Sequence, residues 1–124
     1  SWGQSVGEDK KVSAPRVYEL RTYTTLEGRL PALHDRFKNH TMKLFEKHGM
    51  RNEMYWIPAE GDRKNDTLIY IVSHESMDAA KKSWDAFRND PEWHKVRDAS
   101  EKDGKIVAKV DAVYMNLTDY SPKH

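Results

Sequence analysis

The sequence contains no cysteine among its 124 residues. This absence excludes disulfides, thiol nucleophiles, thiolate zinc sites and iron–sulfur clusters. It does not identify the compartment, because reducing and oxidising compartments both hold proteins without cysteine. The chain opens with Ser1 rather than methionine, which removal of a targeting or signal peptide, or other trimming upstream, would explain. The location in the cell therefore stays open.

An excess of charge of one sign is also missing. The 21 Lys and Arg residues nearly balance the 20 Asp and Glu residues, which leaves a net charge of +1. This balance gives no electrostatic argument for binding nucleic acid or an acidic membrane surface. A sheet that binds RNA is basic and lined by aromatic residues, and Glu19 and Glu53 argue against such a sheet. No apolar run approaches the length needed to span a bilayer, so we predict no nucleic-acid partner and no transmembrane segment.

The signatures of metal and phosphate sites are absent as well. The six histidines form no H-E-x-x-H motif, and the six glycines are scattered rather than gathered in a phosphate-binding loop. His40 and His48 are expected on the apolar stripe of one helix, but their spacing of eight residues separates them by roughly 12 Å along its axis, too far for one zinc ion. We therefore predict no metal site and no cofactor. A single histidine would still suit an axial haem ligand or a general base, although such a residue is more often part of a packed core.

The apolar periodicity predicts one α+β domain over residues 16–122, preceded over residues 1–15 by a flexible arm rich in Gly, Ser and charge. We expect strands over 16–24, 50–57, 67–74 and 105–118. Helices are expected over 30–48 and 76–87, the second of them capped by Ser76 or a neighbour. A short third helix is expected to begin at Pro91, behind the capping residue Asp90. This order is that of a ferredoxin-like β-α-β-β-α-β sandwich, with the helices on one face of a four-stranded antiparallel sheet. The other face is left bare, and a second copy of the chain is its simplest cover.

The first strand, VYELRTY, carries a row of polar side chains. Tyr18 and Leu20 are its apolar pair, so we expect them to face the helices and Glu19, Arg21 and Tyr23 to face the opposite side. This row would suit a ligand clamp in which Arg21 grips a carboxylate or carbonyl group. It would equally suit an interface between two subunits, and we favour the interface because a two-fold axis supplies partners for buried charges.

Several aromatic residues suggest a pocket between the helices and the sheet, namely Trp56, Tyr70, Trp84 and Trp93. The helical spacing of Trp84 and Phe87 instead favours a role in the core. Both interpretations remain open at the level of the sequence.

Three segments together resemble the NIPSNAP family: VYELRTYTTLEGRLPAL, SWDAFRNDPEWHKVRDASE and the closing LTDYSP. The chain departs from the family pattern at Val72-Ser73-His74-Glu75, where many members carry a Tyr-Glu pair. The resemblance implies a dimeric α+β barrel, in which two ferredoxin-like halves pack their sheets face to face. The wider superfamily includes cofactor-independent monooxygenases, haem-degrading enzymes and dehydratases, whereas NIPSNAP domains mostly lack an assigned chemistry. In eukaryotes, members associate with mitochondria.

Enzymes of this superfamily hold their substrate in the cleft between the helices and the sheet. By this resemblance, the candidate ligand-cleft residues are Tyr18, His40, Tyr70, Trp84 and Trp93. The sequence shows no clear base, nucleophile or metal set, so whether the chain is an enzyme stays open. We predict a homodimeric domain that binds a small apolar ligand or a protein partner. The alternative is a small enzyme of the superfamily, either a cofactor-free monooxygenase or a haem-active protein.

Overall fold

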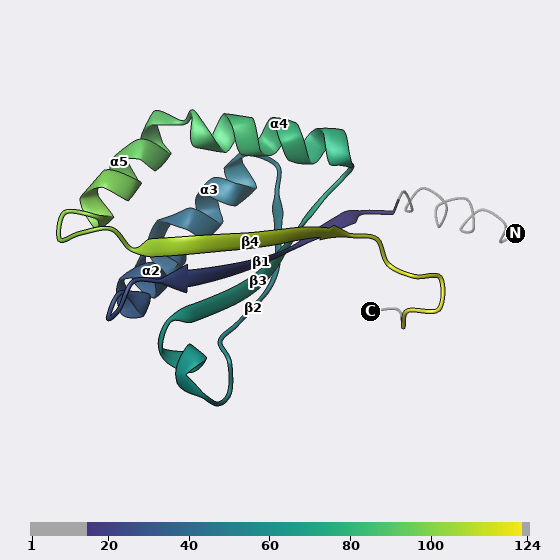
Figure 1. Ribbon diagram of the computed structural model, residues 1–124. Coiled ribbons are helices and arrows are strands. Elements are labelled where there is room, and N and C mark those ends of the chain that lie inside the picture. The colour runs from purple at the N-terminus through teal and green to yellow at the C-terminus, as the bar shows by residue number, and fades with distance from the viewer. Residues whose placement is uncertain (1–14, 123–124) are drawn as a thin grey trace, which may run out of the picture.

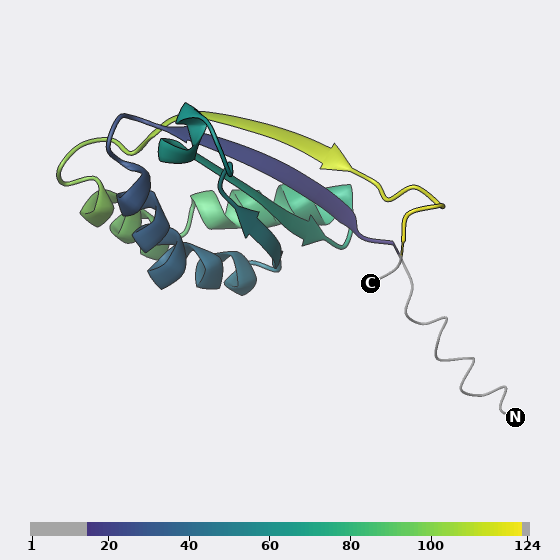
Figure 2. The same cartoon turned by 90° about the horizontal axis from the view of Figure 1, so that it is seen from below.

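The computed structural model describes residues 15–122, so the predicted N-terminal arm lies outside the described residues except for Pro15. One antiparallel sheet has the strand order β2-β3-β1-β4, and the helices cover a single face of it (Figures 1 and 2). The strands are β1 (Val17–Thr25), β2 (Arg51–Trp56), β3 (Thr67–His74) and β4 (Val107–Met115). The helical segments are α2 (Leu30–Arg36), η1 (Phe37–Thr41), α3 (Met42–Lys47), η2 (Asp62–Asn65), α4 (Met77–Arg88) and α5 (Pro91–Ser100). The predicted ferredoxin-like α+β fold is confirmed.

The first helical segment runs from α2 through η1 into α3, as predicted for residues 30–48. Its apolar stripe is buried in the core and consists of Leu30, Leu33, Phe37 and Leu44. The turn at η1 is π-helical and holds more residues than an α-helical turn. Thr41 of this turn is buried, whereas His40 is exposed. The expectation that His40 lies within the apolar stripe is therefore wrong, because the wider turn changes the phase of the helix.

The two later helices begin at the predicted caps. The Ser76 side chain accepts a hydrogen bond from the backbone N–H of Ala79 at 3.0 Å, and α4 begins directly after it. The Asp90 side chain accepts one from the N–H of Glu92 at 2.8 Å, with Pro91 in the first turn of α5. Asp90 also bonds to His48 Nε2 at 2.7 Å, which ties the end of α3 to the start of α5.

The core lies between the helices and the sheet and is largely aromatic. The rings of Phe45 and Trp84 meet edge to face with centroids 5.4 Å apart, and Phe37 meets Tyr70 in the same way at 5.1 Å. Trp84 and Phe87 are 6% and 5% exposed, so their predicted place in the core is confirmed.

The orientation predicted for β1 is wrong. Glu19 is 1% exposed and bonds to an indole of α4, so Glu19, Arg21 and Tyr23 point toward the helices. Because side chains alternate along a strand, Tyr18 and Leu20 lie on the open face. The prediction relied on hydrophobicity, and it failed because the polar side chains satisfy one another inside the subunit. The argument that placed the polar row at an interface between two sheets no longer applies.

The open face of the sheet carries apolar side chains from all four strands. Leu20 of β1 lies between Ile71 of β3 and Val113 of β4 in the strand register. Val113 is 50% exposed, and Met54 and Trp56 of β2 are 60% and 43% exposed. This face is therefore unusually apolar for a surface in contact with water. None of the helices within residues 15–122 combines the length and hydropathy needed to cross a membrane.

Candidate ligand-binding site

The carboxylate of Glu19 is the centre of a buried polar cluster between the sheet and α4. Trp84 Nε1 and His74 Nε2 both donate to its Oε1 at 2.8 Å, and Arg21 Nη1 donates to Oε2 at 2.8 Å. Burial alone would raise the pKa of Glu19, but the bonds from His74 and Trp84 and the charge of Arg21 outweigh burial and lower the pKa. Glu19 is therefore an ionised acceptor whose oxygens are already engaged.

Arg21 joins this carboxylate to two tyrosines. Its Nε donates to the hydroxyl of Tyr70 at 2.9 Å, and its Nη2 donates to the hydroxyl of Tyr23 at 3.2 Å. The guanidinium lies over the ring of Trp84, with Cζ 4.2 Å from the ring centroid. Burial would lower the pKa of Arg21, but the neighbouring tyrosines and Glu19 raise it, so the side chain stays charged. The salt bridge and the aromatic stack hold the guanidinium in one orientation.

His74 supports the cluster from β3. Its side chain is fully buried, and its Nδ1 has no hydrogen-bond partner among the described residues. A proton on Nδ1 would have no acceptor there, so the ring carries its proton on Nε2 and donates it to Glu19. His74 thus orients the carboxylate. It does not present a nitrogen to solvent.

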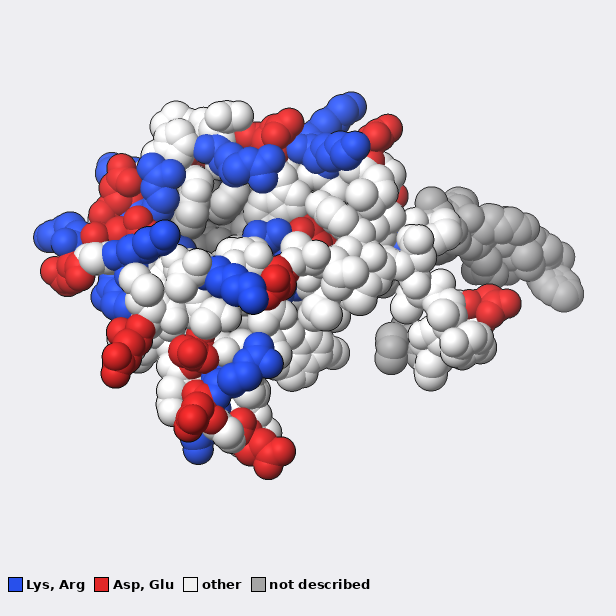
Figure 3. Space-filling model, in the orientation of Figure 1, with Lys and Arg blue, Asp and Glu red and all other residues white. Residues whose placement is uncertain are grey.

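A hollow separates the helices from β4, and basic and acidic atoms are visible inside it (Figure 3). Two residues on the helix-facing side of β4, Val110 and Tyr114, are 43% and 39% exposed. They pair with Tyr23 and Glu19 of β1, so they border the polar cluster. Burial, followed by the nearby charge of Glu19, raises the pKa of Tyr114. The Arg21 side chain is 15% exposed, which makes it the charged group of the cluster that solvent reaches.

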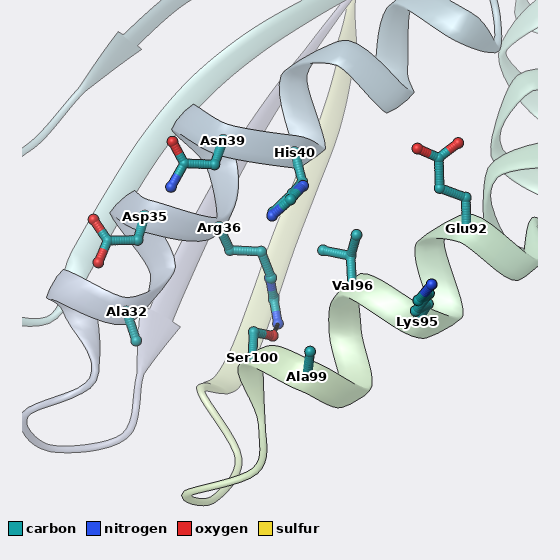
Figure 4. Close-up of a pocket in the computed structure, with 10 residues that line it drawn as sticks. All are labelled: Ala32, Asp35, Arg36, Asn39, His40, Glu92, Lys95, Val96, Ala99 and Ser100. Atoms are coloured by element: carbon teal, nitrogen blue, oxygen red, sulfur yellow. Dashed lines mark hydrogen bonds between the residues drawn. The ribbon is translucent and has the colours of Figure 1, made fainter.

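A second cavity of about 600 Å³ lies between the first helical segment and α5 (Figure 4). Arg36 extends from α2 across its end and donates from Nη1 to Ser100 Oγ at 3.1 Å. The guanidinium lies 5.1 Å from the centroid of the Trp93 ring, and its Nε has no partner among the described residues. Burial lowers the pKa of Arg36 despite the nearby charge of Glu101. The rest of the lining mixes both signs of charge with small apolar residues.

The structure brings together some of the predicted ligand-cleft residues. Tyr70 and Trp84 both contact Arg21, and Trp93 packs against the same core beside α4. His40 instead lines the cavity between α2 and α5, and Tyr18 lies on the open face of the sheet. Within residues 15–122, no three His, Asp or Glu side chains gather closely enough to hold a metal ion.

Sequence reasoning missed His74 of the cluster and Tyr114 at its border. Both face the helices because of the register, which pairs His74 with Val17 and Tyr114 with Glu19. His74 stood out in the sequence only in the departure from the family pattern at Val72-Ser73-His74-Glu75, whereas its partner is a carboxylate 55 residues earlier in the chain. Knowledge of the strand order would have supplied the missing signal.

The family model for NIPSNAP matches residues 18–122. The chain belongs to the NIPSNAP family. The match covers the entire cluster around Glu19 and all four strands except the first residue of β1. The resemblance seen in the sequence is thus confirmed. No protein of curated function matches this NIPSNAP domain in sequence.

Solved structures show the same fold. A NIPSNAP family protein of unknown function from Agrobacterium tumefaciens is 19% identical with a TM-score of 0.73, and the match covers 88% of this chain and 94% of the other. An uncharacterized NIPSNAP-like domain protein from Burkholderia xenovorans is 12% identical with a TM-score of 0.74, covering 90% and 92%. SnoaB, a cofactor-independent oxygenase from Streptomyces nogalater, is 13% identical with a TM-score of 0.59, covering 89% and 100%. At these identities the likeness extends to the fold alone.

Proposed function

We propose that this NIPSNAP domain binds a small, largely apolar ligand in the hollow between β4 and the helices. The observation that carries this proposal is the ion pair of Glu19 and Arg21, held against Trp84 at the border of the hollow. A buried ion pair is weak evidence for a role in stability, because desolvation offsets most of its attraction. Convergent polar groups in an otherwise apolar cleft are, in contrast, typical of ligand sites.

A substitution that fills the hollow tests this proposal. Ala112 is exposed on the helix-facing side of β4 and pairs with Arg21, so a tryptophan there would occupy the space beside the guanidinium. We expect Ala112→Trp to abolish the fluorescence gain of N-phenyl-1-naphthylamine, a neutral planar probe, while the melting temperature stays near that of the wild type. Ala86→Trp, at an exposed position of α4, is the matched control and should retain the signal. Equal probe binding by both variants would refute the proposed location.

We further propose that two copies of the chain pack their open sheet faces together. The support is the contiguous apolar surface on that face, which includes Leu20, Ile71 and Val113. A two-fold axis makes one such patch complementary to itself. Sedimentation at low micromolar concentration should give about twice the 14.5 kDa of one chain. A different protein partner is the alternative cover, and it would leave the isolated chain monomeric.

A catalytic role is the second candidate, and the fold of the oxygenase SnoaB favours it. The polar cluster supports it less, because Glu19 is engaged by three donors and His74 Nδ1 is buried. Neither group is therefore free to accept a proton from a substrate. Oxygen uptake on addition of a polycyclic phenol would favour the oxygenase, and its absence together with binding of the neutral probe would favour a binding domain.

A further inference from the structure

The hydrogen bonds that Arg21 makes leave some of its N–H donors unused, and a guanidinium offers no acceptor. A guanidinium has five N–H groups, and three of them point to Glu19, Tyr70 and Tyr23. Among the described residues, the two remaining N–H groups, one on each Nη, have no partner. The Arg21 side chain is 15% exposed, and these unpartnered N–H groups are its remaining hydrogen-bonding capacity for a bound molecule.

Tyr23 adds a third donor of the same kind. Tyr70 is completely buried, and its hydroxyl accepts a hydrogen bond from Arg21, so its own proton must go to the neighbouring hydroxyl of Tyr23 at 3.0 Å. The Tyr23 oxygen then accepts from both Arg21 and Tyr70. Its own O–H has no acceptor within the described part of the chain. Three unpartnered donors therefore lie next to one another.

The charges of this cluster already balance. Glu19 is ionised and lies 2.8 Å from Arg21, so the pair offers donors without a net positive charge. A ligand carboxylate at these donors would bring a second negative charge close to Glu19, and the repulsion between the two carboxylates would cost binding free energy. A neutral carbonyl oxygen accepts the same hydrogen bonds without that cost.

We infer that the site selects a planar ligand with a neutral carbonyl oxygen, which accepts hydrogen bonds from Arg21 and Tyr23. This inference rests on the proposed function, because it names the ligand chemistry of the same hollow. A planar ligand suits the site because a guanidinium is planar and stacks on aromatic rings, as Arg21 already does on Trp84.

Three probes of one shape separate the alternatives in equilibrium dialysis: 2-acetylnaphthalene as the neutral ketone, 2-naphthoate as the anion and 2-isopropylnaphthalene as the hydrocarbon. We expect the ketone to bind at least about tenfold more tightly than the anion. Tyr23→Phe removes one donor and keeps the ring, and Arg21→Lys keeps the charge beside Glu19 but removes the fork of donors. Each variant should lower the affinity for the ketone about tenfold and leave the affinity for the hydrocarbon unchanged. Tyr55→Phe is the control, because that hydroxyl bonds to Asn52 outside the cluster.

The possible results divide cleanly. Tighter binding of 2-naphthoate than of the ketone would overturn the inference and make the cluster an anion site. Equal losses of affinity for the ketone and the hydrocarbon in the two variants would also overturn the inference, while the proposal of a ligand-binding hollow would remain supported. If none of the three probes binds to the wild-type protein, the proposed function itself fails.

Discussion

Glu19 illustrates how a single side chain can be both buried and charged. Its two oxygens accept from an indole, an imidazole and a guanidinium, so the cost of removing the carboxylate from water is offset by three hydrogen bonds. The same arrangement makes the residue hard to replace. Removing the carboxylate leaves donors of three different elements, β1, β3 and α4, without their acceptor.

Replacing Glu19 with alanine should therefore lower the free energy of unfolding by about 3–5 kcal/mol, because the buried Arg21 would lose its counter-charge. Urea denaturation measures this loss. Glu27→Ala, at an exposed carboxylate, should change stability by less than about 0.5 kcal/mol. In the double variant Glu19→Ala with Arg21→Met, part of the loss should be recovered, because no unpaired charge remains. A double variant that merely adds the two single losses would mean that the pair is not coupled.

The lowered pKa of Glu19 also predicts how stability depends on pH. In the unfolded chain this carboxyl takes up a proton near its ordinary pKa of about 4.3, whereas the folded state resists protonation until the pH is lower. The contribution of Glu19 is thus complete above pH 4.3 and is lost as the pH falls through the folded pKa. The stability gap between the wild type and Glu19→Gln should narrow as the pH falls from about 4.3 through the lower pKa of the folded state. A gap that stays constant over this range would contradict the assigned ionisation, and Glu27→Gln should follow the wild type throughout.

Residue roles were the part of the molecule that the sequence predicted least well. The row Glu19, Arg21 and Tyr23 was recognised as special, but its face was assigned from hydrophobicity and proved wrong. Alternation along a strand separates two faces without saying which one is covered. That choice depends on partners from distant elements, here Trp84 of α4 and His74 of β3, which a local pattern does not contain.

The helices and strands were predicted much better, because their signals are local. Thr67–His74 has the predicted bounds, and α4 and α5 begin at the predicted caps. The π-helical turn at Phe37–Thr41 was not predicted, since one extra residue in a turn leaves the apolar spacing on either side intact. The consequence was the wrong place for His40.

The cap of α4 gives a prediction at the scale of an element. Ser76→Ala removes the acceptor for the Ala79 N–H and should lower the free energy of unfolding by about 1 kcal/mol. Because α4 carries Trp84, the same change should also weaken the binding of N-phenyl-1-naphthylamine. Ser76→Asp supplies another capping oxygen and should restore stability in thermal denaturation. If the aspartate variant is as unstable as the alanine variant, the loss does not come from the cap.

At the scale of the whole molecule, the two faces of the edge strand β4 border different surfaces. It pairs with β1 at one edge of the sheet, and most of its residues are exposed on both faces. The face toward the helices borders the proposed ligand hollow, and the face away from them joins the open apolar surface. The proposed dimer would cover the second face and leave the first one accessible.

Two valines of β4 separate these roles. Val110 and Val113 are 43% and 50% exposed, and they pair with Tyr23 and Leu20, which lie on opposite faces of β1. We expect Val113→Asp to convert the dimer into a monomer in sedimentation, because an unpaired charge would be buried between the two sheets. Val110→Asp should leave the dimer intact and instead weaken the binding of N-phenyl-1-naphthylamine, since the new carboxylate would lie beside the hollow. A dimer that survives Val113→Asp would exclude the open face as the interface, and loss of the dimer in Val110→Asp alone would place the interface on the helix-facing side of β4.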